Sequence, residues 1–327
     1  MEKFKKLKFV RMVGINRIVL LGLLICMYIV FAIASPTFLN YSRILSALNY
    51  AYFLGMLALG VTFVIATGGI DFSVGPVMFA AALISGRLLT VSGVPLGICI
   101  AVAILVGLVF GVINGTLVAY VGLPSFITSM ASMMMAKGVG SVSTGTQSVS
   151  WPQYGDPNGC FRNIIKVQIG TFQFPTGLVI LILAAVVSSI VLNNTKAGRY
   201  ILCLGSNKEA VRLSGVNTKK WEMLSYIICG CFAGLASIFY VAAYTTVQPG
   251  LGDIFNNEAI ASCIMGGTSM AGGLASMGGT IIGTMIIAFL QEGIMALGLQ
   301  KELQYVLTGI IVLVAVFADI RSRRKKN

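Results

Sequence analysis

The stretch PLGICIAVAILVGLVFGVINGTLVAY, residues 95–120, contains no charged residue. An apolar run of about 20 residues is long enough to cross the hydrocarbon core of a bilayer as a helix. Other runs along the chain have the same character, and together they give the candidate spans 18–35, 48–67, 74–90, 95–120, 125–142, 175–193, 223–244, 257–271, 276–297 and 303–320. The segments 125–142 and 257–271 are the weakest members, because they are short and rich in serine or glycine.

The composition of the whole chain agrees with a membrane protein. Of 327 residues, 57% are apolar and 10% are charged, and the mean hydropathy is +0.92. A soluble domain usually carries about 25% charged residues, so this composition excludes water-soluble enzymes, disordered tails and disulfide-stabilised scaffolds. We expect an all-α polytopic membrane protein of about ten transmembrane helices that forms a single domain, residues 1–327.

The basic residues are concentrated in three blocks. The net charge is +13, from 23 Lys and Arg against 10 Asp and Glu. Most of the basic residues fall within 1–17, 195–222 and 320–327. Positively charged loops remain on the cytoplasmic side of a membrane, so all three blocks and both termini are predicted to be cytoplasmic. Six spans before the middle block and four after it satisfy this condition. The segment 143–174 is then an outer loop, and the chain is a multi-pass protein of the inner membrane.

The middle block is long enough to fold outside the membrane. Residues 195–222 read TKAGRYILCLGSNKEAVRLSGVNTKKWE. Ser206 and Glu209 have the spacing of a capping box, and Gly215 can end a helix in the left-handed conformation. The pattern predicts a short helix over about 207–214. Because so short a helix is marginal alone in water, it is either held by docking onto another protein or is a solvated connector.

Two glycine-rich segments suggest a weak internal repeat. GGIDFSVG at 68–75 and GGTSMAGG at 266–273 align at an offset of 198 residues. Each follows one apolar run and precedes another. Paired glycine breaks in corresponding halves are typical of transport pathways, but tight cytoplasmic turns between helices would have the same pattern.

Asp71 is the main acidic residue near a membrane segment. Asp71 and Ser73 stand immediately before the span that begins at Val74, with Pro76 in its first turn. A carboxylate is stabilised at a helix N-terminus by free N–H groups and the helix dipole, whereas it is costly at the centre of a bilayer. Helix capping is therefore favoured over direct contact with a substrate.

Other residue types restrict the chemistry. The chain has no histidine, and no Gly-x-x-x-x-Gly-Lys-Ser/Thr phosphate loop occurs in it. Its seven cysteines show neither a disulfide framework nor a metal spacing. Glycines four apart, at Gly107, Gly111 and Gly115, would let helices pack closely. No catalytic residue and no metal site are expected, and a transport protein without an engine of its own implies a partner that supplies one.

Several motifs together resemble those of the membrane permeases of ribose-type sugar ABC importers. They are GGIDFSVG, Asn114-Gly115, PSFI at 124–127, AGRYILCLGSNKEAVRLSGV at 197–216, and EAIASCIMGGTSMAGGLASMGGTIIGT at 258–284. The resemblance covers about residues 40–318. The chain departs from the family's pattern at Phe72, Cys203 and Ala275, where leucine, alanine and arginine are usual.

The resemblance implies a type II ABC-importer-like permease that imports a monosaccharide by alternating access. It implies a second permease chain (homodimer or heterodimer), an extracytoplasmic sugar-binding protein, and a cytoplasmic ATPase that holds ATP and Mg, while this chain binds no cofactor. The ATPase would contact Gly198, Arg199, Tyr200, Gly205, Asn207, Ala210, Arg212, Leu213 and Gly215. Candidate residues of the substrate pathway are Asp71, Ser73, Asn114, Phe126, Thr268 and Ser269.

Two other classes of function remain open. An ion-coupled secondary transporter of a small neutral solute would use Asp71 as its coupling site. A membrane scaffold that does not transport would bind partners without moving a solute.

Overall fold

The computed structural model describes residues 15–170, 172–300, 302–310, 313 and 317. The predicted basic segments 1–17 and 320–327 lie outside these residues, except for 15–17. The longer helices are α3 Ile15–Ala34, α4 Tyr41–Ala66, α5 Val74–Thr90, α6 Leu96–Thr116, α7 Ser125–Thr144, α8 Thr176–Asn194, α9 Lys196–Leu213, α10 Thr218–Ala243, α11 Asp253–Met265 and α12 Met277–Ala296. A further helical segment begins at residue 303 and is described to residue 310.

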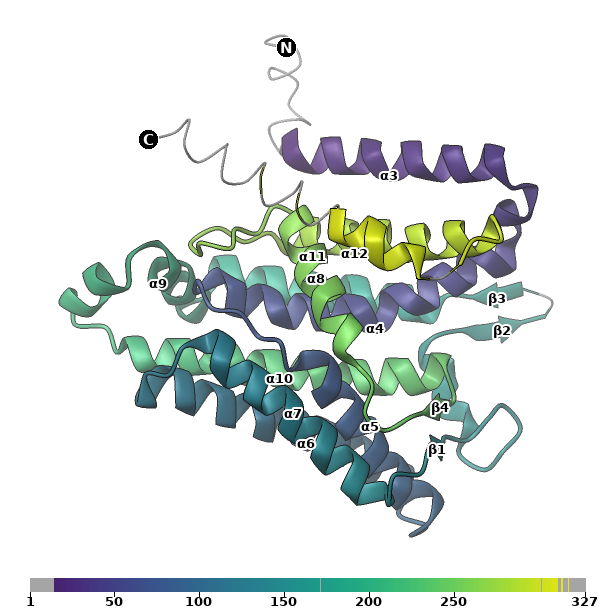
Figure 1. Cartoon of the computed structure of the whole chain (residues 1–327), viewed down its shortest axis with the longest axis horizontal. Helices are drawn as coiled ribbons and strands as arrows, with labels where there is room; N and C mark the ends of the chain where they lie inside the picture. Colours follow the sequence, from purple (N-terminus) through teal and green to yellow (C-terminus); the bar gives the residue numbers. More distant parts are fainter. Residues whose placement is uncertain (1–14, 171, 301, 311–312, 314–316, 318–327) are drawn as a thin grey trace.

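Shorter elements join these helices. They are η1 Pro36–Leu39, the π-helical turn η2 Leu117–Val121 that continues α6, η3 Gly159–Ile164, and the strands β1 Val149–Ser150, β2 Val167–Ile169, β3 Phe172–Phe174 and β4 Thr246–Val247. Strand β1 pairs antiparallel with β4, and β2 pairs antiparallel with β3. Helices α4, α8, α10 and α12 run along the long axis of the molecule, and both pairs of strands lie at the same end (Figure 1).

A helix lies in every predicted span whose residues are described. Among these residues, five helical segments are both long and apolar enough to cross a membrane: α4, α6 with η2, α8, α10 and α12. Residues 18–34 and α5 are shorter apolar helices. The structure therefore confirms a mostly helical polytopic protein, while the crossing of ten helices stays a prediction.

The predicted bounds of the span 257–271 are wrong. Helix α11 covers Asp253–Met265, which is 13 residues and about 20 Å at 1.5 Å per residue, whereas a hydrocarbon core is about 30 Å thick. Gly266 caps the helix, and Gly267 with φ +89° ends it in the left-handed conformation. Residues after Gly267 form a loop that leads to α12, so the helical part of this span is by itself shorter than a hydrocarbon core is thick.

The core is built around α4. From Tyr50 to Ala66 every residue of this helix is buried, and α10, α11 and α12 pack against it. A helix that is apolar on all sides is stable when other helices cover it completely. In contrast, α8 exposes a row of large apolar side chains, Val179, Ile182, Leu183, Val186, Val187 and Ile190, as a lipid-facing helix does.

Small residues bring α6 and α10 into close contact, as the glycine spacing predicts. A Cβ on Gly107 would lie 2.7 Å from the backbone nitrogen of Gly234, and a Cβ on Gly230 would lie 2.9 Å from the Cα of Gly111. Real Cβ atoms do not approach backbone atoms so closely. The two helices can therefore meet at these positions only with glycine on both sides.

Replacing Gly107 with alanine should lower the stability of the folded protein. The added methyl group meets backbone that cannot rotate away, and overpacking of this kind costs about 1–3 kcal/mol. Gly97→Ala is the matched control, because Gly97 lies in the same helix with nothing within 4 Å of an added Cβ. Thermal unfolding of the purified protein should show a lower Tm for Gly107→Ala alone. Equal Tm values for the two variants would contradict this account of the contact.

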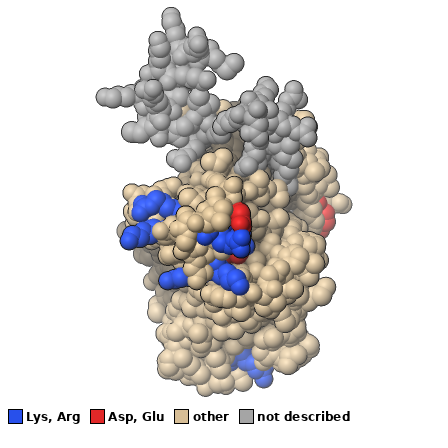
Figure 2. Space-filling model, turned by 90° about the vertical axis from the view of Figure 1, so that its left-hand side faces the viewer, with Lys and Arg blue, Asp and Glu red and all other residues tan. Residues whose placement is uncertain are grey.

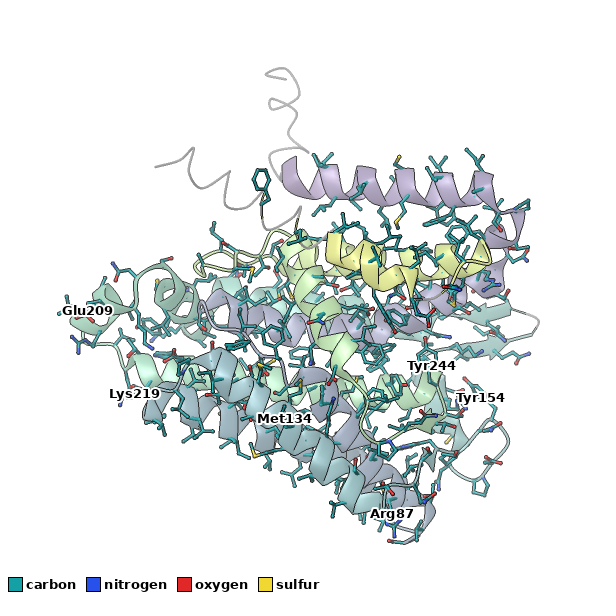
Figure 3. All side chains as sticks on the ribbon, in the orientation of Figure 1. Arg87, Met134, Tyr154, Glu209, Lys219 and Tyr244 are labelled. Carbon is teal, nitrogen blue, oxygen red and sulfur yellow. The ribbon has the colours of Figure 1, made fainter. Side chains whose placement is uncertain are left out.

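The two ends of the bundle differ in charge. Six exposed basic side chains lie around α9 and the start of α10: Lys196, Arg199, Lys208, Arg212, Lys219 and Lys220. Lysine and arginine side chains gather on this end, hereafter the basic end (Figure 2). Glu209 and Lys219 lie there, while Tyr154 and Arg87 lie at the opposite end, hereafter the hairpin end because it carries β2 and β3 (Figure 3).

The segment between α7 and α8 is fastened to the hairpin end by Arg162. Its side chain is 9% exposed, and its Nε and Nη2 donate to the carbonyl oxygen of Ala242 at 3.0 and 2.8 Å. The guanidinium lies 5.2 Å from the centre of the Tyr154 ring. Burial lowers the pKa of the Arg162 guanidinium and raises the pKa of the Tyr154 hydroxyl. This contact holds the predicted outer loop 143–174 against the end of α10.

Candidate functional site

Helix α9 consists of two helical segments joined at Asn207. Asn207 has φ −161° and ψ 94°, which is not helical. Its side-chain oxygen accepts a hydrogen bond from the backbone nitrogen of Ala210 at 2.9 Å, so Asn207 is the N-cap of the second segment. The predicted capping box at Ser206 is wrong by one residue: the Ser206 hydroxyl donates to the carbonyl oxygen of Leu202, and Glu209 pairs with Arg212.

The second segment of α9 forms an exposed tip. Leu213 is 78% exposed, and Arg212 pairs with Glu209 on the surface. Gly215, with φ +80°, ends the segment as predicted. The tip is held by Lys208, which pairs with Glu222 of α10 at 2.7 Å. The tip thus presents one large apolar side chain among charged ones, at the end of a short helix.

The first segment of α9 packs tightly on the bundle. Gly198 is buried, and the ring of Tyr200 lies 5.1 Å from that of Trp221. A Cβ on Gly205 would collide with the carbonyl oxygen of Ala66 and would lie 2.9 Å from the Cα of Gly272. Of the nine predicted docking residues, Gly198 and Gly205 therefore face the bundle. Tyr200 is half-buried, and the other six are exposed: Arg199, Asn207, Ala210, Arg212, Leu213 and Gly215.

The two glycine-rich segments meet beneath α9. The backbone nitrogen of Gly273 donates to the carbonyl oxygen of Ala66 at 3.0 Å, so the loop after α11 is bonded to the end of α4. Gly68 and Gly267, with φ +85° and +89°, follow the caps of these two helices. In the structure, Gly68 therefore occupies the position equivalent to Gly267. The offset between the two segments is 199 residues, one more than the predicted 198. Both segments are turns between helices, and they form a junction with the first segment of α9.

Asp71 and Ser73 belong to a buried polar network. Asp71 Oδ1 accepts from the Ser73 nitrogen at 2.8 Å and from the Ser73 hydroxyl at 2.6 Å. Asn114 of α6 donates to the Ser73 hydroxyl oxygen at 2.9 Å and accepts from Ser132 of α7. The free N–H of Gly75 at the start of α5 is capped by Asn256 of α11 at 2.7 Å. Asp71 therefore braces the residue before α5, and the cap comes from another helix.

Asp71→Asn should fold, but with lower stability and weak transport. The substitution keeps one acceptor for Ser73 but turns an amide N–H₂ toward the side-chain N–H₂ of Asn114. A hydrogen bond to a charged group contributes about 1.5–3 kcal/mol and a neutral one about 0.5–1.5, so we expect a loss of about 1–2 kcal/mol. Unfolding and substrate uptake should be measured together. A variant of unchanged Tm that transports nothing would instead assign Asp71 to the substrate pathway.

The six predicted pathway residues do not come together at one surface. Asp71, Ser73 and Asn114 share the buried network, each at most 2% exposed. Thr268 and Ser269 are buried in the loop after α11, where the Thr268 hydroxyl oxygen accepts from the Ser276 nitrogen. Phe126 is 52% exposed and packs edge-on against Phe72, with ring centres 5.9 Å apart.

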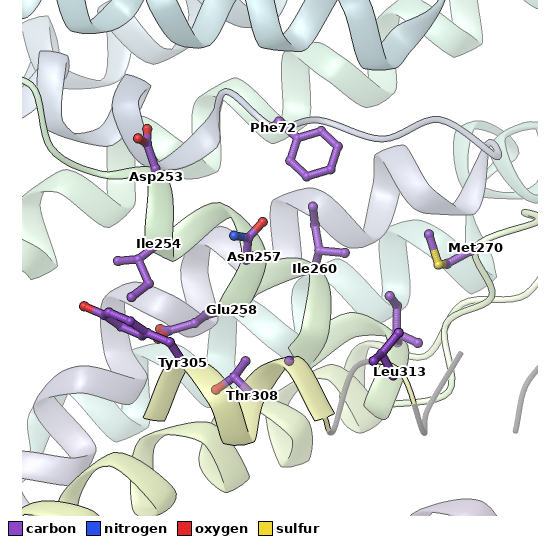
Figure 4. A pocket seen from close by; sticks show the side chains of 12 residues that line it. Phe72, Asp253, Ile254, Asn257, Glu258, Ile260, Met270, Tyr305, Thr308 and Leu313 are labelled. Atoms are coloured by element: carbon purple, nitrogen blue, oxygen red, sulfur yellow. The ribbon is translucent and has the colours of Figure 1, made fainter. Parts of the chain in front are cut away.

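An open groove beside α11 carries polar side chains that the motif analysis missed. It has a volume of about 890 Å³ and lies between α11 and the helical segment from residue 303 (Figure 4). Its walls are mainly apolar, with Phe72 at one side, and its polar members are Asp253, Asn257, Glu258, Tyr305 and Thr308. The carboxylate of Glu258 accepts from Tyr50 and from Gln304. The signal in the sequence was the group of four polar residues that follows Gly250 and Gly252, namely Asp253, Asn256, Asn257 and Glu258.

Comparison with known proteins identifies relatives along nearly the whole chain. Residues 43–316 match the family described as branched-chain amino acid transport system / permease component. The chain is 32% identical over 302 residues to the ribose import permease protein RbsC of Escherichia coli K12, which covers 92% of each chain. It is 33% identical over 311 residues to RbsC of Bacillus subtilis 168, covering 94% of this chain and 92% of the relative. It is 30% identical over 274 residues to the fructose import permease protein FruG of Bifidobacterium longum, covering 82% and 79%. No solved structure matches the chain.

Proposed function

This chain belongs to the family of permease components just described, and from that membership we propose that it is the permease subunit of an ATP-driven, binding-protein-dependent importer of a monosaccharide. It is a multi-pass protein of the inner membrane. The observation that carries the proposal is the similarity to ribose import permeases over more than nine-tenths of each chain. The substrate is accordingly a ribose-like pentose or a hexose, because other relatives are import permeases for fructose and galactose.

The exposed tip of α9 supports a separate ATPase chain. The tip carries Leu213 and Arg212 at the basic end, which the positive-inside bias places in the cytoplasm together with both termini. ATP and Mg would be held by that partner, so this chain is a transport subunit and not an enzyme. A second permease chain and an extracytoplasmic sugar-binding protein complete the proposed assembly.

The contacts of α9 suggest how a movement at the tip would reach the membrane. Gly205 touches both the end of α4 and the glycine loop before α12. A displacement of α9 is thereby transmitted to two helices at once, and this coupling would open and close the path by alternating access. A neutral sugar requires hydrogen-bond partners rather than a charge. The groove beside α11 offers Asn257 and Thr308 for this purpose.

Uptake measurements test the proposal directly. Source cells lacking this gene should lose the uptake of radiolabelled ribose, fructose or galactose, and the intact gene should restore it. Uptake should stop when ATP is depleted and should persist with a protonophore. Uptake that survives ATP depletion and collapses with the protonophore would identify the ion-coupled transporter. A copurifying ATPase without loss of any solute uptake would identify the scaffold.

A further inference from the structure

The β2–β3 hairpin separates its side chains by polarity. In the antiparallel register, Val167 pairs with Phe174 and Ile169 pairs with Phe172, while Gln168 pairs with Gln173. Successive side chains of a strand point to opposite faces. One face, hereafter the apolar hairpin face, therefore carries Val167, Ile169, Phe172 and Phe174, and the other carries the two glutamines.

The apolar hairpin face is largely uncovered within the described chain. Ile169 is 63% exposed, Phe172 is 51% exposed and Phe174 is 41% exposed. The hairpin is nevertheless held in a defined place. The ring of Tyr41, at the start of α4, stacks on Phe172 with ring centres 5.1 Å apart, and its hydroxyl donates to the carbonyl oxygen of Gln173.

The opposite face of the hairpin points toward polar structure. Lys166, which precedes β2, donates to the side-chain oxygen of Gln173 at 3.2 Å. The Lys166 ammonium also lies 5.9 Å from the centre of the Tyr154 ring. The glutamine face thus belongs to the polar loop held by Arg162, and the apolar hairpin face is directed away from it.

The hairpin that carries the apolar face joins directly to α8, which also exposes large apolar side chains. Strand β3 is followed by Pro175 and then directly by α8, whose exposed side is formed by valines, isoleucines and leucines. Aromatic side chains are common where a membrane protein passes through the interface between lipid and water. Phe172 and Phe174 belong to β3, at the hairpin end of the bundle (Figure 1), and Tyr41 stacks on Phe172, so the three form such a group.

We propose that the apolar hairpin face is embedded in the bilayer at its hydrocarbon–headgroup boundary, where it anchors the hairpin end of the protein to lipid. A partner protein that binds and leaves in each cycle would return three large apolar side chains to water every time, which is unfavourable. Lipid covers them continuously. No charged side chain lies on this face, as burial among acyl chains requires.

Site-specific photocrosslinking tests this assignment. A benzophenone amino acid is placed at Ile169 or Phe172 in separate variants, and at Gln168 on the opposite face as the matched control. Each variant is reconstituted in vesicles of phosphatidylethanolamine and phosphatidylglycerol, irradiated and analysed by mass spectrometry. Lipid adducts should form several-fold more at 169 and 172 than at 168. Equal or lower yields at 169 and 172 would overturn the proposal.

A second irradiation distinguishes lipid from protein as the occupant. The same variants are irradiated in intact source membranes, where all partner chains are present. Adducts from position 172 should again be lipid, and an adduct to another protein chain as the main product would overturn the proposal. Size-exclusion profiles identical to that of the unmodified protein show that the variants are folded. The measurement needs no transported substrate, so its result is independent of the proposed sugar.

Discussion

Arg212→Glu and Leu213→Asp are each expected to abolish copurification of the partner ATPase while leaving membrane insertion unchanged. Both side chains lie on the exposed tip of α9, with Leu213 78% exposed and the Arg212 side chain 68% exposed. Neither contributes to the core, so neither change should unfold the protein. Truncation of a central interface residue costs about 2 kcal/mol or more, and a factor of ten in affinity corresponds to about 1.4 kcal/mol. We expect the affinity to fall by at least about 30-fold.

The control for this experiment reverses a positive charge at the other end of the molecule. Lys166→Glu reverses a basic side chain near the hairpin, where no ATPase contact is proposed. Pull-down of the ATPase from solubilised membranes should be normal with Lys166→Glu and lost with either tip variant. Retained ATPase in both tip variants would show that α9 is a solvated connector, the alternative that the sequence pattern left open.

The sequence predicted the elements that depend on local signals. The span 74–90 coincides with α5, because glycine, serine and proline mark both of its ends. The close packing of α6 was visible in its glycine spacing, since only glycine permits that approach. The end of α9 followed from Gly215 for the same reason. Each of these features is decided within a few residues of the chain.

Features that depend on distant contacts were misjudged. Helix α11 resembled a weak span, but its polar residues are satisfied by partners far along the chain: Asn256 caps Gly75, 181 residues away, and Glu258 bonds Tyr50, 208 residues away. No local pattern contains these pairs. The candidate pathway residues were misjudged for the same reason. They were selected by their local motifs, but long-range packing places them in the buried network, in the loop after α11 and on the surface.

The N-cap within α9 shows how tertiary packing overrides a local motif. Ser206 fits the capping box by sequence, yet the first segment of α9 remains helical as far as this residue. Gly205 is packed there against Ala66 and Gly272, and this contact holds the chain in helical form for one residue longer. The break then falls on Asn207, which is an equally good cap.

Gly205→Ala is expected to uncouple ATP hydrolysis from transport without releasing the ATPase. The new methyl group would collide with the carbonyl oxygen of Ala66 and would lie 2.9 Å from the Cα of Gly272. Backbone cannot rotate out of the way, so α9 must separate from the junction, at a cost of about 1–3 kcal/mol. The exposed tip with Leu213 is unchanged, and docking is therefore retained. Carried in the barrier to movement, this cost should lower sugar uptake by about 5-fold to 150-fold, since about 1.4 kcal/mol corresponds to a factor of ten in rate.

This outcome differs from that of the tip variants, and the difference isolates the role of the junction. Gly138→Ala is the matched control, because Gly138 lies within α7 with nothing within 4 Å of an added Cβ; it should bind the ATPase and transport normally. Copurification of the ATPase, ATP hydrolysis and sugar uptake are measured for the unmodified protein, Gly205→Ala and Gly138→Ala, each in membranes prepared in the same way. If Gly205→Ala transports at the normal rate, movement does not pass through this contact, and other contacts of α9, such as Lys208 with Glu222 or Tyr200 with Trp221, carry it instead.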